Sequence, residues 1–470
     1  MSLIADPQQW AEHTFGSADL GRAGRPARLT YSAARIAEHP EKSFPEIFDW
    51  NELRAFYRIC DKPTATVNAI QAPHRQQTRQ AMGEHPLVLI VHDTSELDFS
   101  SHRALKGRGP IGNDRGKGFL QHNSLAIVPS PRQLLGLAHQ QLRVRRHAPA
   151  KETTRARKQR ERESLLWQKG IKATGRPPEG CTWVDVGDRG ADDYEAMAAS
   201  LAIGHNFLFR ITQDRLVFTT AEHNQQDYLM QFARTLSSKG EDTVEIPGRG
   251  GRRPRIATVS LAAAPVWVPA PKDTPRRKSR PILPCWVIRV WETNPPADVK
   301  EPLEWVLLCS LPTKTLEEIK QRRNWYACRW LVEQYHDVEK NGCSLEHRRF
   351  KTAKRMWACL AILGVVAVRV LQLRLAAQEQ PQAPAAQVAT REEVEVLGRK
   401  LGKKIQTVRE FVYGVARLGG FLGRKGDKVP GVRALWRGYQ RLRDLLAGYR
   451  LHRRSVPSNV PHGDSPAAFP

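Results

Sequence analysis

Two aspartates, Asp93 and Asp188, each follow a run of apolar, β-rich residues. Asp93 comes after Leu87-Val-Leu-Ile-Val and His92, and Asp188 comes after Thr182-Trp-Val-Asp-Val and a glycine. Such runs are typical of buried strands in α/β sheets, and sites in open α/β sheets form beyond the carboxyl ends of the strands. We therefore expect the two carboxylates to meet. A single acid at a strand end is also a common turn or helix-cap residue.

A third acid, Glu333, lies in a segment whose periodicity predicts one long helix from about Leu316 to Lys340. Counted from Tyr326, the residues Arg329, Glu333 and Lys340 follow at offsets of 3, 7 and 14. In a regular α-helix these offsets place them at about −60°, −20° and −40°, on one narrow face. Ion pairing along a helix also produces such a charge mix. A Tyr, Arg and Lys stripe beside a carboxylate favours phosphate binding next to a metal ligand.

Three carboxylates suit hard divalent cations, with Mg2+ as the expected ion and Mn2+ as a substitute. Two such ions about 4 Å apart would activate a water or 3′-hydroxyl and stabilise the leaving oxygen of an in-line displacement. A zinc site is less favoured, because the 15 histidines show no HExxH or Cys-His pattern. We interpret His92 as a hydrogen-bonded strand-end residue. The predicted chemistry is phosphodiester hydrolysis and transesterification.

The charge balance indicates a polyanionic partner. The chain has 74 Lys and Arg against 48 Asp and Glu, a net charge of +26, which attracts nucleic acid over distances beyond contact range. Charge alone leaves open a basic surface without chemistry. The arginines near the N-terminus, Arg28 among them, form a set able to track phosphates.

The cysteine pattern and the apolar runs indicate a cytoplasmic protein. The seven cysteines are scattered and never spaced as CxxC, which argues against a disulfide framework or a zinc knuckle. The longest apolar run, from Cys359 to Val368, is about half the ~20 residues that a membrane span needs. The N-terminus lacks the pattern of a signal peptide. We expect no membrane anchor.

The pattern of apolar residues divides the chain into three predicted domains. Residues 1–82 read as a helical domain, 83–375 as a mixed α/β sheet domain, and 376–470 as a helical domain with a disordered tail after Ser455. Residues from about 216 to 305 read as a β-rich insertion carrying basic clusters around Arg252 and Arg277. The further strands and helices predicted within the sheet domain are Leu125–Val128, Leu134–Leu142, Tyr194–Ile203, Phe207–Ile211 and Lys354–Leu375.

The spacing Tyr326-x2-Arg329-x3-Glu333-x6-Lys340 is the most specific motif in the chain. Together with His92-Asp93-Thr94, Asp188-Arg-Gly-Ala-Asp and Arg28 in Ala-Arg-Leu, it resembles the YREK signature and the other markers of bacterial cut-and-paste transposases of insertion sequence family four. The resemblance covers nearly the whole chain. The chain departs from the pattern at Glu38 and Asp61, which stand where basic end-contacting residues are expected, although Lys62 adjoins the second.

The resemblance implies a ribonuclease H-like catalytic core interrupted by a β insertion, an N-terminal domain that binds transposon ends and a C-terminal domain that pairs protomers in a synaptic complex. It implies that Asp93, Asp188 and Glu333 hold the metal ions and that Tyr326, Arg329, Lys340 and Arg210 contact DNA. It also implies that water nicks one strand, that the freed 3′-hydroxyl forms a hairpin, and that the opened 3′ end attacks target DNA. Trp305 matches the position that stacks a flipped base at the hairpin, although a strand-end core aromatic would look the same.

Two other functions stay open at this point. A catalytically silent DNA-binding derivative, or a transposition inhibitor that pairs with the active form, would keep the fold without the reaction. A nuclease of the same fold would cut without strand transfer. The presence of all three acids, Trp305 and the four residues of the spaced motif favours the transposase.

Overall fold

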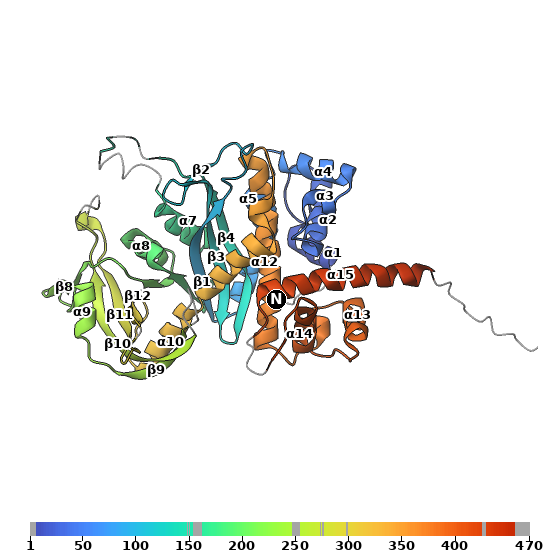
Figure 1. Cartoon of the computed structure of the whole chain (residues 1–470). Helices are drawn as coiled ribbons and strands as arrows, with labels where there is room; N and C mark the ends of the chain where they lie inside the picture. The colour runs from blue at the N-terminus through green and yellow to red at the C-terminus, as the bar shows by residue number, and fades with distance from the viewer. Residues whose placement is uncertain are drawn as a thin grey trace, which may run out of the picture. The chain divides into compact units, whose positions relative to one another are not determined.

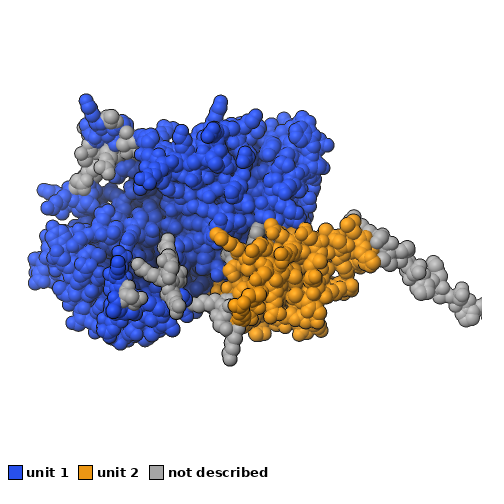
Figure 2. Space-filling view, in the orientation of Figure 1, with its two compact units in different colours: residues 1, 7–375 blue, residues 2–6, 376–470 orange. Residues whose placement is uncertain are grey.

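The structure is a computed structural model, and it describes residues 6–147, 149, 151–153, 162–246, 254–272, 274, 277–297, 299–424 and 429–455. The chain divides into two compact units, Pro7–Leu375 and a second unit that runs from Ala376 onward (Figure 2). Arg252 of the first basic cluster and the predicted tail beyond Ser455 lie outside the described residues.

The first unit begins with helices whose starts carry capping signals. In α4, Asp49 accepts from the Glu52 amide while the Glu52 side chain accepts from the Asp49 amide, a reciprocal cap that satisfies orphan backbone donors. Thr66 caps α5 in the same region by accepting from the Ala69 amide. The helices of this segment are α1 (Pro7–Phe15), α2 (Gly24–Glu38), α3 (Phe44–Ile47), α4 (Trp50–Cys60) and α5 (Val67–Gly83).

A mixed sheet follows, and its central strands run in the order β4-β3-β1-β5-β6. The strands β4, β3 and β1 are antiparallel neighbours, whereas β5 and β6 run parallel to β1. This arrangement, with helices between the parallel strands, is consistent with the predicted ribonuclease H-like fold. The strands are β1 (Leu87–Asp98), β2 (Gly109–Ile111), β3 (Gly116–Pro129), β4 (Arg132–Arg143), β5 (Thr182–Gly187) and β6 (Asn206–Arg210).

The β-rich insertion continues this sheet and does not form a separate one. Its last strand, β12, pairs with β6 on one side and with β11 on the other, so the described sheet reaches twelve strands. Strands β10 and β11 form the longest of the new ladders. The elements of the insertion are β7 (Leu216–Phe218), β8 (Gln226–Tyr228), α9 (Leu229–Thr235), β9 (Gly240–Ile246), β10 (Arg255–Val268), β11 (Leu283–Glu292) and β12 (Glu304–Cys309).

Helices cover both faces of the central strands (Figure 1). On one face, α5, α7 (Leu165–Thr174) and α8 (Tyr194–Ala202) pack over apolar side chains such as Ile90 and Phe207. On the other face lie α11 and the long helix α12 (Ala353–Glu379). Helix α12 has the length and apolarity of a membrane span, but 72% of its most apolar window is buried inside the protein, which is the condition of a core helix.

The prediction of one long helix from Leu316 to Lys340 is wrong in detail, because this segment forms three elements. Helix α10 (Leu316–Ala327) ends at Cys328, α11 (Trp330–Asp337) follows, and Val338–Gly342 forms a π-helical turn. The prediction that β1 ends at His92-Asp93-Thr94 is also wrong, since β1 continues to Asp98. The residues after Val91 stay in the ladder because β3 pairs with them throughout.

Among its described residues, the second unit contains the α-helices α13 (Arg391–Leu401), α14 (Val408–Leu418) and α15 (Val432–Ser455). Glycines let α14 and α15 approach closely. A Cβ on Gly419 would lie 1.8 Å from the Ala434 carbonyl oxygen, and one on Gly438 would lie equally close to that of Val415. Leu435, Leu442 and Leu446 of α15 are buried.

Candidate active site

The alternation of strand β1 separates two neighbouring residues, His92 and Asp93, onto opposite faces of the sheet. Successive side chains in a strand point to opposite sides. His92 lies on the α7 side, where its ring is 6.3 Å from that of Trp167. Asp93 lies on the α11 side, where its carboxylate is 3.7 Å from Nδ1 of His336. The catalytic carboxylate predicted on β1 therefore faces the helix that carries Glu333.

The electrostatics of Asp93 show that the three predicted acids lie in one neighbourhood. Its side chain is 16% exposed. Burial and, after it, the negative charges of Asp188 and Glu333 together raise the pKa of Asp93 to about 7, against the opposing charge of Arg329. A carboxylate whose pKa is raised by burial and by like charges is a marker of functional sites.

Asp188 and Glu333 each have a protein partner. Asp188 directly follows β5, as predicted, and its Oδ1 accepts from the Gly190 amide at 2.8 Å, which caps a short 3-10 turn. Oε1 of Glu333 accepts from Nη2 of Arg329 at 2.7 Å. Within the residues that the structure describes, no three His, Cys, Asp or Glu side chains are grouped closely enough to hold a metal ion.

A second cluster adjoins the acids and contains Tyr326, Arg210 and Trp305. The Trp305 and Tyr326 rings meet edge to face at 5.2 Å. Burial raises the pKa of Tyr326, while the charges of Arg329 and Arg210 and a hydrogen bond with Arg210 oppose that shift. Asp188 also acts on Tyr326 through its charge. The structure thus brings Arg210 and Trp305 beside the tyrosine of the spaced motif.

Arg210 and Trp305 open onto a cleft of about 830 Å³. Arg189 and Trp330 line the same cleft, and Trp330 is 39% exposed. The sequence interpretation missed both as site residues. Their neighbours in the sequence could have identified them, because Arg189 follows Asp188 and Trp330 follows Arg329. Arg189 is exposed, so the cleft offers cationic and aromatic groups together.

Lys340 reaches β1 from the π-helical turn. The Cys343 amide donates to the Val338 carbonyl at 2.8 Å, five residues back, which widens this turn by one residue relative to an α-helix. Nζ of Lys340 donates to the Glu96 carbonyl at 2.7 Å and lies 3.9 Å from the Glu346 carboxylate. Lys340 is therefore placed three residues along β1 from Asp93.

A buried polar network lies behind Asp93 and anchors both His336 and the π-helical turn. Nε2 of His336 lies 2.9 Å from Nδ2 of Asn123, the residue opposite Asp93 in the ladder. Gln121 donates to both oxygens of Glu339 at 2.7 and 2.8 Å, and Tyr335 donates to Glu339 at 3.1 Å. Burial raises the pKa of Glu339 to about 7.

The opposite face holds a different network around Asp185, a residue of β5 that is 0% exposed. Its two carboxylate oxygens lie 2.9 Å from Nε2 of His92 and 3.0 Å from Nδ1 of His205. The other His92 ring nitrogen lies 2.9 Å from Oγ of Ser124, so His92 is hydrogen-bonded as interpreted. Burial would raise the pKa of Asp185, but His205 and His92 overcome it and hold that pKa well below the usual range.

The predicted end-contacting residues lie in the N-terminal segment, Arg28 on α2 and Lys62 in the turn after α4. Arg28 and Lys62 are exposed, and the Arg28 guanidinium lies 5.4 Å from the ring centroid of Tyr31. Asp61, the acidic departure beside Lys62, is ion-paired with Arg355 of α12. Glu38 is likewise paired with Arg35 at 2.9 Å. Both acids thus have partners within the protein.

Two family models match the chain outside the segment that carries the three acids. Residues 7–65 match a transposase DNA-binding domain, and residues 365–458 match the dimerisation domain of the Tn5 transposase. These matches support a Tn5-like DNA transposase. The first match supports DNA as a partner, and the second supports the formation of dimers.

Proposed function

We propose that this transposase binds the ends of a transposon, cleaves them at Asp93, Asp188 and Glu333, and transfers the 3′ ends into target DNA. The observation that carries the proposal is the shared electrostatic neighbourhood of three acids that come from β1, the end of β5 and α11. Structural carboxylates are normally placed beside a cation, whereas here the charges of Asp188 and Glu333 act on a buried Asp93. The family matches at both ends of the chain agree with this function.

The chemistry of these donors fits Mg2+, with Mn2+ as a substitute and two ions per site. Carboxylate oxygens are the preferred ligands of such ions, and a divalent cation would relieve the repulsion that, after burial, raises the pKa of Asp93. Asp93, Asp188 and Glu333 would hold it, and Glu333 would exchange its contact with Arg329 for the metal. When bound, the ions supply acidification of the attacking water or 3′-hydroxyl and stabilisation of the leaving oxygen.

The remaining site residues hold double-stranded DNA in place. Arg329, which is 12% exposed, and Lys340 would bind phosphates on either side of the scissile bond. The Tyr326 hydroxyl would donate to one of these phosphates, with Arg210 beside it. The exposed arginines of the N-terminal helices, Arg28 included, and Lys62 would contact the transposon end, where counterion release makes binding weaken with salt.

The order of reactions that we propose is nicking by water, hairpin formation by the freed 3′-hydroxyl, hairpin opening and strand transfer. Trp305 would stack the base that is extruded at the hairpin. Its contact with Tyr326 and its place on the lining of the cleft support this role. We expect the reaction to occur in a homodimeric synaptic complex in the cytoplasm, at the nucleoid.

The deciding experiment is cleavage of DNA that carries the element's own ends, with Mg2+, resolved into nicks, hairpins and double-strand breaks. Asp93→Asn, Asp188→Asn and Glu333→Gln should each reduce cleavage by at least about a thousandfold while DNA binding persists, because metal ligation needs the charged carboxylate. Glu317→Gln is the matched control, since Glu317 is an exposed acid of the preceding helix with an 83% exposed side chain. Equal cleavage by Glu333→Gln and wild type would remove Glu333 from the site. Binding without cleavage by every form would favour a catalytically silent derivative.

Trp305→Ala tests the hairpin step separately. We expect first-strand nicking at nearly the wild-type rate and hairpin formation slowed about tenfold to a hundredfold, because stacking of an extruded base is worth about 1–3 kcal/mol. Gel analysis of a single-turnover reaction measures both steps. Hairpins formed at the wild-type rate would show that Trp305 is only a core aromatic.

A further inference from the structure

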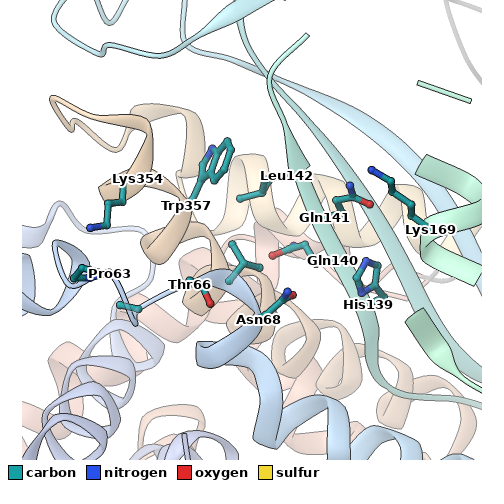
Figure 3. Close-up of a pocket in the computed structure, with 12 residues that line it drawn as sticks. Pro63, Thr66, Asn68, His139, Gln140, Gln141, Leu142, Lys169, Lys354 and Trp357 are labelled. Carbon is teal, nitrogen blue, oxygen red and sulfur yellow. The ribbon is translucent and has the colours of Figure 1, made fainter. Parts of the chain in front are cut away.

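A pocket of about 530 Å³ lies along the outer edge of strand β4 and shares no lining residue with the cleft at Trp305 (Figure 3). Its walls come from four segments that are distant in the sequence: the turn before α5, strand β4, helix α7 and the start of α12. The turn contributes Pro63 and Ala65, which belong to the segment matched as a transposase DNA-binding domain. The pocket therefore lies where DNA-binding helices meet the catalytic sheet.

The charge of this pocket is positive. Lys169 and Lys354 line it, and none of its described lining residues is acidic. Figure 3 shows the two lysines at opposite ends of the labelled group, with Trp357 between them. Nζ of Lys354 donates to the Asp61 carbonyl at 2.6 Å, and the Asp61 carboxylate is ion-paired with Arg355. Thr66 and Asn68 also line the pocket and belong to the amino-terminal turn of α5. This turn is the positive end of the dipole of a 17-residue helix.

The interior of the pocket offers one aromatic ring and unsatisfied polar atoms. The Trp357 ring is held edge to face against Phe119 at 6.0 Å. Among the described residues, neither Nε1 of Trp357 nor Nδ1 of His139 has a hydrogen-bond partner, although both atoms are buried. His139 is 9% exposed, and burial lowers its pKa to about 3, so its ring is neutral. A buried polar atom without a partner costs about 1–3 kcal/mol, which a ligand with polar edges would recover.

We propose that this pocket receives one nucleotide of a bound DNA strand. Its base would lie against Trp357 with its polar edge toward His139 and Gln141, and the phosphates on its two sides would meet Lys169 and Lys354. A nucleotide within a strand carries a phosphate on each side, which matches lysines at both ends. A free mononucleotide carries one phosphate and would contact only one of the two lysines. The inference rests on the proposed function, because the DNA must be a bound transposon end or target.

The test uses the full-length protein and end DNA in which 2-aminopurine replaces one base at a time, without divalent metal. Fluorescence reports a base that has left the stack, and anisotropy reports binding in the same samples. We expect at least one position whose fluorescence rises in wild type and equally in Trp305→Ala, and falls about fivefold or more in Trp357→Ala. Because Trp357→Ala also removes the contact with Phe119, on which folding can depend, Lys169→Gln combined with Lys354→Gln provides a second variant with the same expected loss.

Lys172→Gln is the matched control, since Lys172 is an exposed lysine of α7 that does not line the pocket. It should leave both signals unchanged. The proposal is overturned if every fluorescent position depends on Trp305 and none on Trp357 or the lysine pair. It is also overturned if a free deoxynucleoside monophosphate binds in a Lys169-dependent manner while the DNA signal does not depend on Lys169. Cleavage of the same DNA is then measured after addition of Mg2+. Cleavage without a pocket-dependent signal means that the pocket proposal fails, whereas absence of cleavage means that the proposed function fails.

Discussion

Two aspartates on adjacent strands, Asp93 and Asp185, have opposite electrostatic properties. Asp185 is the more deeply buried, yet His92 and His205 hold its pKa below the usual range. Asp93 is 16% exposed, yet its pKa is raised to about 7. Burial favours the neutral form of both carboxylates, and their neighbours decide the difference between them. The histidines give Asp185 a structural role, whereas burial and the neighbouring acids leave Asp93 in need of a cation.

Substitution of Asp185 should have the largest effect on stability. We expect Asp185→Asn to lower the free energy of unfolding by about 3–5 kcal/mol at neutral pH, because it removes one partner from a buried ionic network. Urea unfolding measures the loss. The depressed pKa of Asp185 means that its stabilisation is present above about pH 4 and is lost as the pH falls further.

Glu179→Gln is the control for this change, since Glu179 is an exposed acid in the loop before β5. It should unfold like the wild type. A fully stable Asp185→Asn variant would contradict the structural role of the network.

The second-largest effect should be on the pH dependence of stability, which distinguishes Asp93 from Asp185. The folded pKa of Asp93, about 7, lies above its ordinary value of 3.8. The folded protein therefore retains a proton that the unfolded chain has lost, and stability falls as the pH rises between these values. Without metal, wild type should lose about 2–4 kcal/mol more than Asp93→Asn between pH 4 and pH 8.

Chemical denaturation of both proteins in chelator at several pH values measures this difference. Mg2+ added at pH 8 should restore stability to the wild type and not to Asp93→Asn. Parallel pH profiles for the two proteins would show that Asp93 is not protonated at neutral pH.

Substitution of His336, which faces Asp93 from α11, should have the smallest effect of these changes. His336→Leu removes both the contact with Asn123 and the group facing Asp93, and should slow cleavage about tenfold to a hundredfold with DNA binding unchanged. His336→Gln can keep the contact with Asn123 and should retain more activity. Equal rates for wild type and the leucine variant would show that Asp93 needs no such support.

Much of the fold is predictable from local patterns, since the strands β5 and β6 and helix α8 lie where the apolar runs predict them. The spaced motif also predicts that Tyr326, Arg329 and Glu333 share a region with Asp93 and Asp188, and their mutual electrostatic effects agree. The reach of β1 beyond Asp93 was not predictable, because Thr94, Ser95 and Glu96 are polar and remain in the sheet only through pairing with β3.

Contacts between distant segments account for the other differences. His205 lies 20 residues from Asp185 and His92 lies 93 residues away, so no local spacing reveals that network. The π-helical turn contains Glu339, whose partner Gln121 is 218 residues away. The pocket at Trp357 likewise combines side chains from four segments.

The π-helical turn at Val338–Gly342 has a consequence for protein engineering. Removal of one residue there would restore an ordinary α-helical turn and rotate the following side chains by about 100°. Lys340 would then leave the Glu96 carbonyl, or Glu339 would leave Gln121. The interval between Glu333 and Lys340 should therefore tolerate many exchanges of residue type but not a change in length.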